Sequence, residues 1–126
     1  MRYSYQRDTI LNIVKNSTDH PSAKTIYLRC KNIIPNISLG TVYRNLNSLV
    51  TNNLVKKIEI PCDSDRFDKT LYNHYHFYCN KCKNVFDIEL KNIESINKII
   101  ENDTLYIVNN VNILADGICH NCKKEK

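Results

Sequence analysis

Apolar residues in the first half of the chain recur every three or four positions, in three separate runs. That spacing gathers them on one face of an α-helix. A serine precedes each run, and its side chain can accept a backbone N–H at a helix start. We therefore predict helices that begin after Ser4, Ser22 and Ser38, the first ending near Asn16. Their apolar faces contain Ile10, Leu11, Ile13 and Val14, then Ala23, Ile26, Tyr27 and Cys30, then Val42, Leu46, Leu49 and Val50.

The third predicted helix also has a polar face. At about 100° per residue, Arg44 falls nearly opposite the apolar stripe, and Tyr43 lies at its border. Asn52 or Asn53 can end this helix, because asparagine tolerates the left-handed backbone of a helix C-cap. The exposed face is therefore available for binding, although Tyr43 could instead belong to the helix-packing core.

A β-hairpin is predicted to follow the helices. Residues 54–60 alternate enough for a strand, PCDSD reads as a turn, and residues 66–72 could form the returning strand. Three helices and a hairpin are the element order of a winged helix-turn-helix. We assign residues 1–70 to this domain, with a boundary near residues 68–72.

The second half, residues 71–126, mixes strands and helix, so the chain as a whole is predicted to be α+β. Residues 74–79 and 84–90 read as strands on either side of a CNKC turn, and residues 104–119 as one or two more. Residues 92–102 read as a helix. Its inward face would contain Ile93, Ile96, Ile99 and Ile100.

The length of 126 residues allows one ordinary domain or two very small ones. No apolar run approaches the roughly 20 residues that a membrane span needs. The start of the chain has neither the apolar region nor the cleavage site of a secretion signal. We therefore expect a cytoplasmic protein without a membrane partner, in which cysteines stay reduced and bind metal more readily than they form disulfides.

The net charge of +5 lies entirely in the first half. Residues 1–70 contain 11 Lys and Arg against 6 Asp and Glu, whereas residues 71–126 contain 7 of each kind. A basic half joined to a neutral half suggests a module that binds a polyanion such as nucleic acid. A basic surface that serves solubility alone is the alternative.

Four cysteines occur in two CxxC pairs, Cys79 with Cys82 and Cys119 with Cys122. Each pair can present two thiolates about one tetrahedral edge apart, and two pairs complete a closed site for structural zinc. A redox pair or buried free thiols are the alternatives. Cys30 has no partner at such spacing and lies on an apolar helix face.

Histidines and aspartates suggest a second metal site. His74 and His76 would lie on one face of a strand, and His20, Asp68 and Asp87 are further candidates. Imidazoles and carboxylates together suit Fe²⁺ or Mn²⁺ better than a closed zinc site. Spacing alone does not show that these five residues converge. His120 is expected to be a bystander.

Seven segments carry a resemblance to a known family. They are QR at 6–7, HPSA at 20–23, ISLGTVYRNL at 37–46, RFD at 66–68, HYHFYCNKC at 74–82, Asp87, and GICHNC at 117–122. Together they resemble the ferric uptake regulator (Fur) superfamily, and most of all its peroxide-sensing branch. Lys83 departs from this pattern, because the family usually has glycine there. Asp87, where iron sensors usually have glutamate, favours the peroxide-sensing branch.

The resemblance implies a homodimeric transcriptional repressor. Its winged helix would bind an inverted-repeat operator in double-stranded DNA, and its second domain would dimerise and hold the zinc. The regulatory Fe²⁺ or Mn²⁺ would be bound by His20, Asp68, His74, His76 and Asp87. The residues expected at DNA are Thr41, Tyr43, Arg44, Asn45, Lys56 and Lys57.

The same resemblance implies a trigger. One ion bound by residues of both halves would fix the angle between the halves. In a dimer this angle would set the spacing of the two recognition helices, which must meet half-sites about one helical turn, or a multiple, apart. Hydrogen peroxide would react at the ferrous ion and oxidise His20 or His74, which releases the operator in a single, non-enzymatic event. Two alternatives stay open: an iron- or manganese-responsive regulator without peroxide chemistry, and a small metalloenzyme that uses His74, His76 and an aspartate.

Overall fold

The computed structural model describes residues 4–70, 75–88 and 96–124. The chain divides into two compact units, Met1–Leu71 and Tyr72–Lys126. Along the described part of the chain, none of the helices has the length and apolar character needed to cross a bilayer.

The helices of the first unit begin where the serines predict. They are α1 (Tyr5–Asn16), α2 (Ala23–Cys30) and α3 (Leu39–Thr51). The hydroxyl oxygens of Ser4, Ser22 and Ser38 accept N–H groups three residues ahead, at 3.3, 3.2 and 3.1 Å. Each serine therefore satisfies a backbone donor that the helix leaves without a partner.

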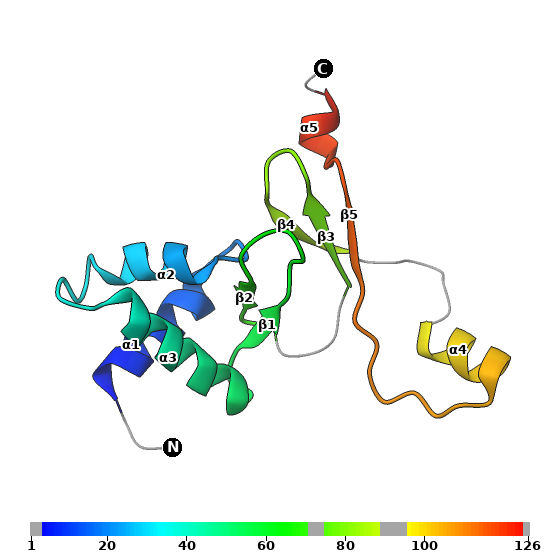
Figure 1. The fold of residues 1–126 in the computed structure, drawn as a ribbon, viewed down its shortest axis with the longest axis horizontal. Helices are drawn as coiled ribbons and strands as arrows, with labels where there is room; N and C mark the ends of the chain where they lie inside the picture. Colours follow the sequence, from blue (N-terminus) through cyan, green and yellow to red (C-terminus); the bar gives the residue numbers. More distant parts are fainter. Residues whose placement is uncertain (1–3, 71–74, 89–95, 125–126) are drawn as a thin grey trace. The chain divides into compact units, whose positions relative to one another are not determined.

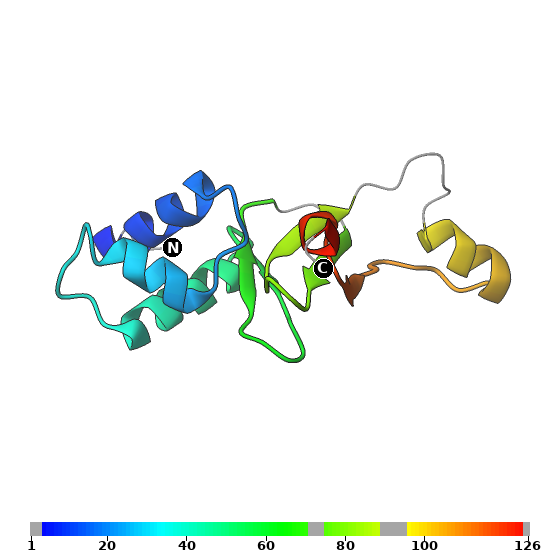
Figure 2. The same cartoon turned by 90° about the horizontal axis from the view of Figure 1, so that it is seen from above.

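The apolar stripes meet in one core. The helices α1, α2 and α3 contact one another side by side, as Figures 1 and 2 show. The chain leaves α3 through Asn53, whose φ of 59° is left-handed, as predicted for one of the two asparagines. The buried residues of this core are Ile10, Val14, Ala23, Ile26, Cys30, Ile37, Val42, Leu46, Leu49, Val55 and Phe67.

A hairpin of β1 (Lys56–Ile58) and β2 (Arg66–Asp68) follows α3. The strands pair antiparallel, with Lys56 opposite Asp68. Both are shorter than the predicted spans 54–60 and 66–72. The first ends before Pro61, which has no N–H to donate, and the end of the second span lies outside the described residues.

The described part of the second unit contains a sheet of three strands in the order β4-β3-β5. The strands β3 (Tyr75–Cys79) and β4 (Val85–Ile88) pair antiparallel, as the predicted hairpin requires. Strand β5 (Leu114–Gly117) pairs parallel to β3. The turn between β3 and β4 contains Lys83 at a φ of 65°. Glycine would enter this left-handed region without steric cost, whereas a lysine there is strained.

One prediction for the second unit was wrong, and another was confirmed over a shorter span. Helix α4 (Ile96–Thr104) lies within the predicted region, but none of its described residues is buried, and Ile99 is 42% exposed. Ile93 lies outside the described residues. The segment predicted to form one or two strands contains one among the described residues, β5, which confirms that prediction over a shorter span. Helix α5 (His120–Lys124) was not predicted. The prediction assumed that the isoleucine face packs within its own chain, but the described residues leave Ile96 and Ile100 only half-buried.

Candidate metal sites and nucleic-acid-binding helix

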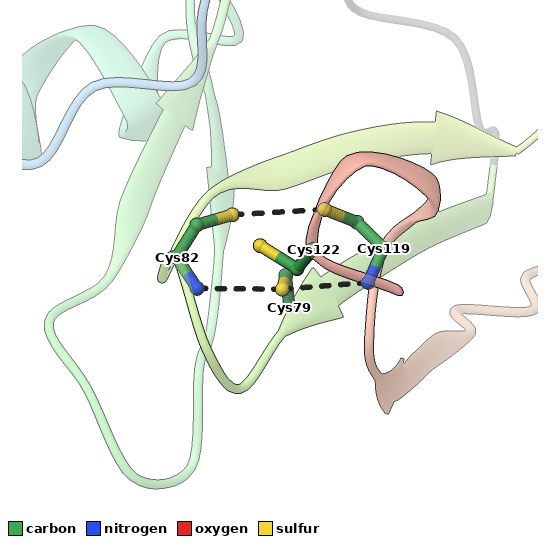
Figure 3. Close-up of side chains that lie close together, drawn as sticks. All are labelled: Cys79, Cys82, Cys119 and Cys122. Carbon is green, nitrogen blue, oxygen red and sulfur yellow. Dashed lines mark hydrogen bonds between the residues drawn. The ribbon is translucent and has the colours of Figure 1, made fainter. Parts of the chain in front are cut away.

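The four paired cysteines come together in the second unit. Their sulfur atoms all lie within 4.8 Å of one another, and the Sγ atoms of Cys82 and Cys119 are 3.8 Å apart (Figure 3). The fold causes this meeting because the parallel pairing of β3 and β5 ends with Cys79 opposite Gly117, just before Cys119. The backbone N–H of Asn80 also donates to the Gly117 carbonyl at 2.7 Å.

This cluster fits a zinc ion. A Zn–S distance of about 2.3 Å in a tetrahedron separates neighbouring sulfurs by about 3.8 Å. Desolvation by burial would raise the pKa of the Cys79 thiol, but backbone N–H groups of Cys82 and Cys119 lower this pKa to about 6. The same crowding raises the pKa of Cys122 to about 12, first through its hydrogen bond with Cys119 and then through burial. A dication would stabilise all four thiolates at once.

His20 and Asp68 are neighbours in the first unit. His20 Nε2 lies 3.4 Å from Asp68 Oδ2, and both side chains are nearly buried. Two backbone contacts bring the α1–α2 loop to β2. The N–H of Phe67 donates to the Pro21 carbonyl at 2.9 Å, and Ser22 forms a β-bridge with Arg66. A metal ion between an imidazole and a carboxylate would be chemically suited to this pair.

His76 and Asp87 form a similar pair in the second unit. They are opposite each other in the β3–β4 register, and His76 Nε2 lies 3.4 Å from Asp87 Oδ1. His76 is buried, whereas the Asp87 side chain is 49% exposed. His74 lies outside the described residues. The two His–Asp pairs belong to different units, and a single ion shared by both stays a prediction.

A polar network beside His20 was not predicted. Both Nη atoms of Arg29 donate to the carboxylate of Asp19, at 3.2 and 2.9 Å, and Nη1 also donates to Ser17 Oγ at 3.1 Å. The Arg29 guanidinium lowers the pKa of the Asp19 carboxyl through this hydrogen bond. No periodicity or motif marks these residues, so only the packing of α2 against the loop could reveal them.

Helix α3 presents Tyr43 and Arg44 to solvent. Tyr43 is 45% exposed, which argues against its alternative place in the core. Arg44 Nη2 donates to Thr41 Oγ1 at 3.0 Å, and Asn45 Nδ2 donates to the Thr41 carbonyl at 2.8 Å. The polar groups of Thr41 and Asn45 are thus used within the helix, whereas Arg44 has five N–H donors and keeps several for a ligand.

The predicted basic contacts of the hairpin lie on β1. Lys57 is exposed and Lys56 is half-buried. Alternate residues of a strand face opposite sides, so Lys57 lies opposite its buried neighbour Ile58. An exposed lysine here is suited to a phosphate group.

Comparisons with known proteins all point to one family. The family model described as the ferric uptake regulator family matches residues 1–115. The peroxide-responsive repressor PerR of Staphylococcus epidermidis is 31% identical over 125 residues, 99% of this chain and 83% of that protein. The peroxide operon regulator of Bacillus subtilis is 31% identical over 126 residues, 100% of this chain and 87% of its own. Among solved structures, the Campylobacter jejuni peroxide stress regulator is 31% identical, with a TM-score of 0.76 over 93% of this chain and 88% of that one.

Proposed function

The chain belongs to the ferric uptake regulator family, and from this premise we propose that it is a metal-dependent transcriptional repressor that senses hydrogen peroxide. It is a DNA-binding regulator and not an enzyme. The observation that carries the proposal is the presence of one His–Asp pair in each unit, His20 with Asp68 and His76 with Asp87, each at 3.4 Å. The relatives named for peroxide responses support the choice of signal.

Two kinds of metal ion have different tasks. Zinc held by Cys79, Cys82, Cys119 and Cys122 stabilises the second unit. Fe²⁺ or Mn²⁺ is bound by the two His–Asp pairs together with His74. Because the pairs belong to different units, one ion that binds both would restrict how the units move relative to each other. The metal ion favours DNA binding only if it binds the DNA-binding conformer more tightly than the other conformer. The ratio of these two affinities limits the effect.

The signal enters at the histidine ligands. A ferrous ion held there would supply the chemistry that reduces peroxide, and His20 and His74 would be the imidazoles nearest to the oxidant formed. An oxidised His20 or His74 would no longer bind the metal ion through its ring nitrogen, so the ion would no longer hold the first unit. His20 is almost enclosed by the protein, with 10% of its side chain exposed, which keeps a short-lived oxidant close to the ring.

Homodimerisation is assigned to the second unit. Leu105, Tyr106 and Ile107 are 91%, 69% and 87% exposed, next to the unburied face of α4. Neighbouring apolar residues that are this exposed are typical of a protein interface. A symmetric dimer would present two α3 helices to the two halves of an inverted-repeat operator.

On DNA, Tyr43 and Arg44 are the residues that meet base edges or phosphates, and Thr41 supports Arg44. Arginine reads guanine in the major groove with two parallel N–H donors. Lys57, and Lys56 beside it, contact the phosphate backbone. The basic first unit attracts DNA over a longer range, which makes the association salt-dependent.

The test compares the protein loaded with Fe²⁺ and with Mn²⁺. Stoichiometric peroxide should add one oxygen to a peptide that contains His20 or His74 in the iron form only, and should release the operator from that form. The peptide with His120 is the internal control, because it should stay unmodified. Equal behaviour of the two forms, with metal-dependent DNA binding intact, would favour a metal regulator without peroxide chemistry.

A further inference from the structure

Beside His20 and Asp68 lies a set of polar residues that no assigned site uses: Ser17, Asp19, Arg29 and Lys69, here called the Ser17 network. We infer that the Ser17 network positions the 17–21 loop against β2, so that His20 faces Asp68 before any ion binds. This inference deepens the proposed regulatory role of those two residues and rests on it.

Ser17 is the centre of the network. It is only 7% exposed, and three groups contact it. Its hydroxyl donates to the Ile13 carbonyl at 2.6 Å and accepts from Arg29 at 3.1 Å. Its own carbonyl accepts from Lys69 Nζ at 2.9 Å. One buried residue is thereby connected to α1, to α2 and to the residue that follows Asp68.

Arg29 fixes the direction of the loop on the N-terminal side of His20. Its two Nη atoms donate hydrogen bonds to both carboxylate oxygens of Asp19, the residue before His20. A two-point contact between a planar guanidinium and a carboxylate defines orientation as well as distance. Lysine has the same charge but cannot reproduce this geometry.

The other side of His20 is held by the main chain. Phe67 donates its N–H to the Pro21 carbonyl, and Ser22 bridges to Arg66. The histidine is thus fixed between two anchored points. A ligand whose backbone is already ordered loses less conformational entropy when the ion arrives, so the site binds metal more tightly.

Global stability is a poor measure of this role. The Arg29–Asp19 pair is 41% and 52% exposed, and exposed ion pairs contribute little to folding. The informative group is the Phe67 N–H, because its hydrogen bond to Pro21 breaks whenever the loop leaves β2. The hydrogen-exchange rate of this N–H reports how often the loop leaves β2, and it can be measured without any ion in the regulatory site.

The experiment compares Ser17→Ala with Thr18→Ala in the full-length, zinc-loaded chain. Thr18 is the exposed neighbour in the same loop. We expect Ser17→Ala to speed exchange at Phe67 about tenfold and to weaken Mn²⁺ binding by about tenfold in calorimetry, the scale of lost support around metal ligands. Thr18→Ala should change neither value more than about twofold. Unchanged exchange in Ser17→Ala would overturn the inference.

Two further variants keep the test decisive if Ser17→Ala fails to fold. Arg29→Lys retains the charge and loses the fork, and Lys69→Met removes the contact to the Ser17 carbonyl. Both should accelerate exchange at Phe67, and parent-like exchange in both would contradict a positioning role. If the parent itself bound no Mn²⁺, the proposed function would fail, while the exchange comparison would still decide whether the network seats the loop.

Discussion

The first unit is stabilised by apolar side chains from three helices and a hairpin, with residues such as Ile10, Ile26 and Leu46 fully buried. In the described part of the second unit, one buried cluster consists of Cys79, Cys119 and Cys122, with Phe77 packed against it. The second unit also exposes Leu105 and its neighbours to solvent.

The difference shows what each unit needs. A helical unit of this size can bury enough apolar surface to fold, although domains this small are marginal. A unit of similar length whose helix α4 has no buried residue among those described needs other sources of stability, and the arrangement of its residues suggests two, zinc and a second copy. The following predictions are arranged from the largest expected effect to the smallest.

Removing one sulfur from the cluster should unfold the second unit and spare the first. Structural zinc contributes on the order of 10 kcal/mol in small zinc domains, so Cys122→Ser should abolish protection of the β3–β5 sheet in hydrogen exchange. The amide of His76, which donates to the Ile113 carbonyl, is a suitable reporter. Cys62→Ser, at an exposed cysteine of the first unit, is the control. Simultaneous loss of protection at Phe67 would argue against independent units.

A cavity in the core of the first unit should destabilise the first unit and spare the second. Leu46 is fully buried, so Leu46→Ala should lower the free energy of unfolding of the first unit by about 3 kcal/mol. Urea denaturation, monitored by hydrogen exchange, would measure this free energy of unfolding. Leu39→Ala, at a 37% exposed position of the same helix, should cost far less. An equal loss in the second unit would show that the cores are coupled.

Arg44→Ala should weaken operator binding without destabilising either unit. Loss of a two-point contact to a base costs about 1–3 kcal/mol, or roughly fivefold to 150-fold in affinity. Fluorescence anisotropy with the Mn²⁺-loaded protein measures this. Lys24→Ala removes the same charge from the exposed face of α2 and should matter much less. Comparable losses in both variants would mean that Arg44 acts only through its charge.

A charge in the exposed apolar segment should weaken the dimer. Ile107→Asp is expected to raise the dimer dissociation constant by about tenfold or more, as at central interface positions. Asn109→Asp adds the same charge at an exposed polar position nearby and serves as control. Analytical ultracentrifugation distinguishes them. A parent-like dimer in Ile107→Asp would place the interface elsewhere.

The turn between β3 and β4 should gain stability from glycine. Lys83 has a φ of 65°, a region that costs a side chain about 1–2 kcal/mol, so Lys83→Gly should stabilise the zinc-loaded second unit by about 1 kcal/mol. Lys81→Gly, in the same turn with ordinary φ, should give no gain. A destabilised Lys83→Gly protein in thermal unfolding would mean that contacts of the lysine outweigh its strain.

Local features of this protein could be predicted because neighbouring residues determine them. A serine before an apolar stripe places the start of a helix within a residue, as at Ser4, Ser22 and Ser38. The two CxxC pairs likewise indicate a four-sulfur site, since each turn already sets the separation of its own thiols. The assignment of the five regulatory ligands came from resemblance, not from spacing.

Tertiary structure alone decided which distant groups meet. His20 lies beside Asp68 because Pro21 pairs with Phe67, and the cysteine pairs meet because β5 runs parallel to β3. The Ser17 network depends on the hydrogen bonds that Arg29 of α2 donates to the loop. The partial burial of α4 likewise depends on which elements pack against it. Periodicity and capping act over a few residues, whereas these contacts depend on the packing of whole elements, which a local pattern does not encode.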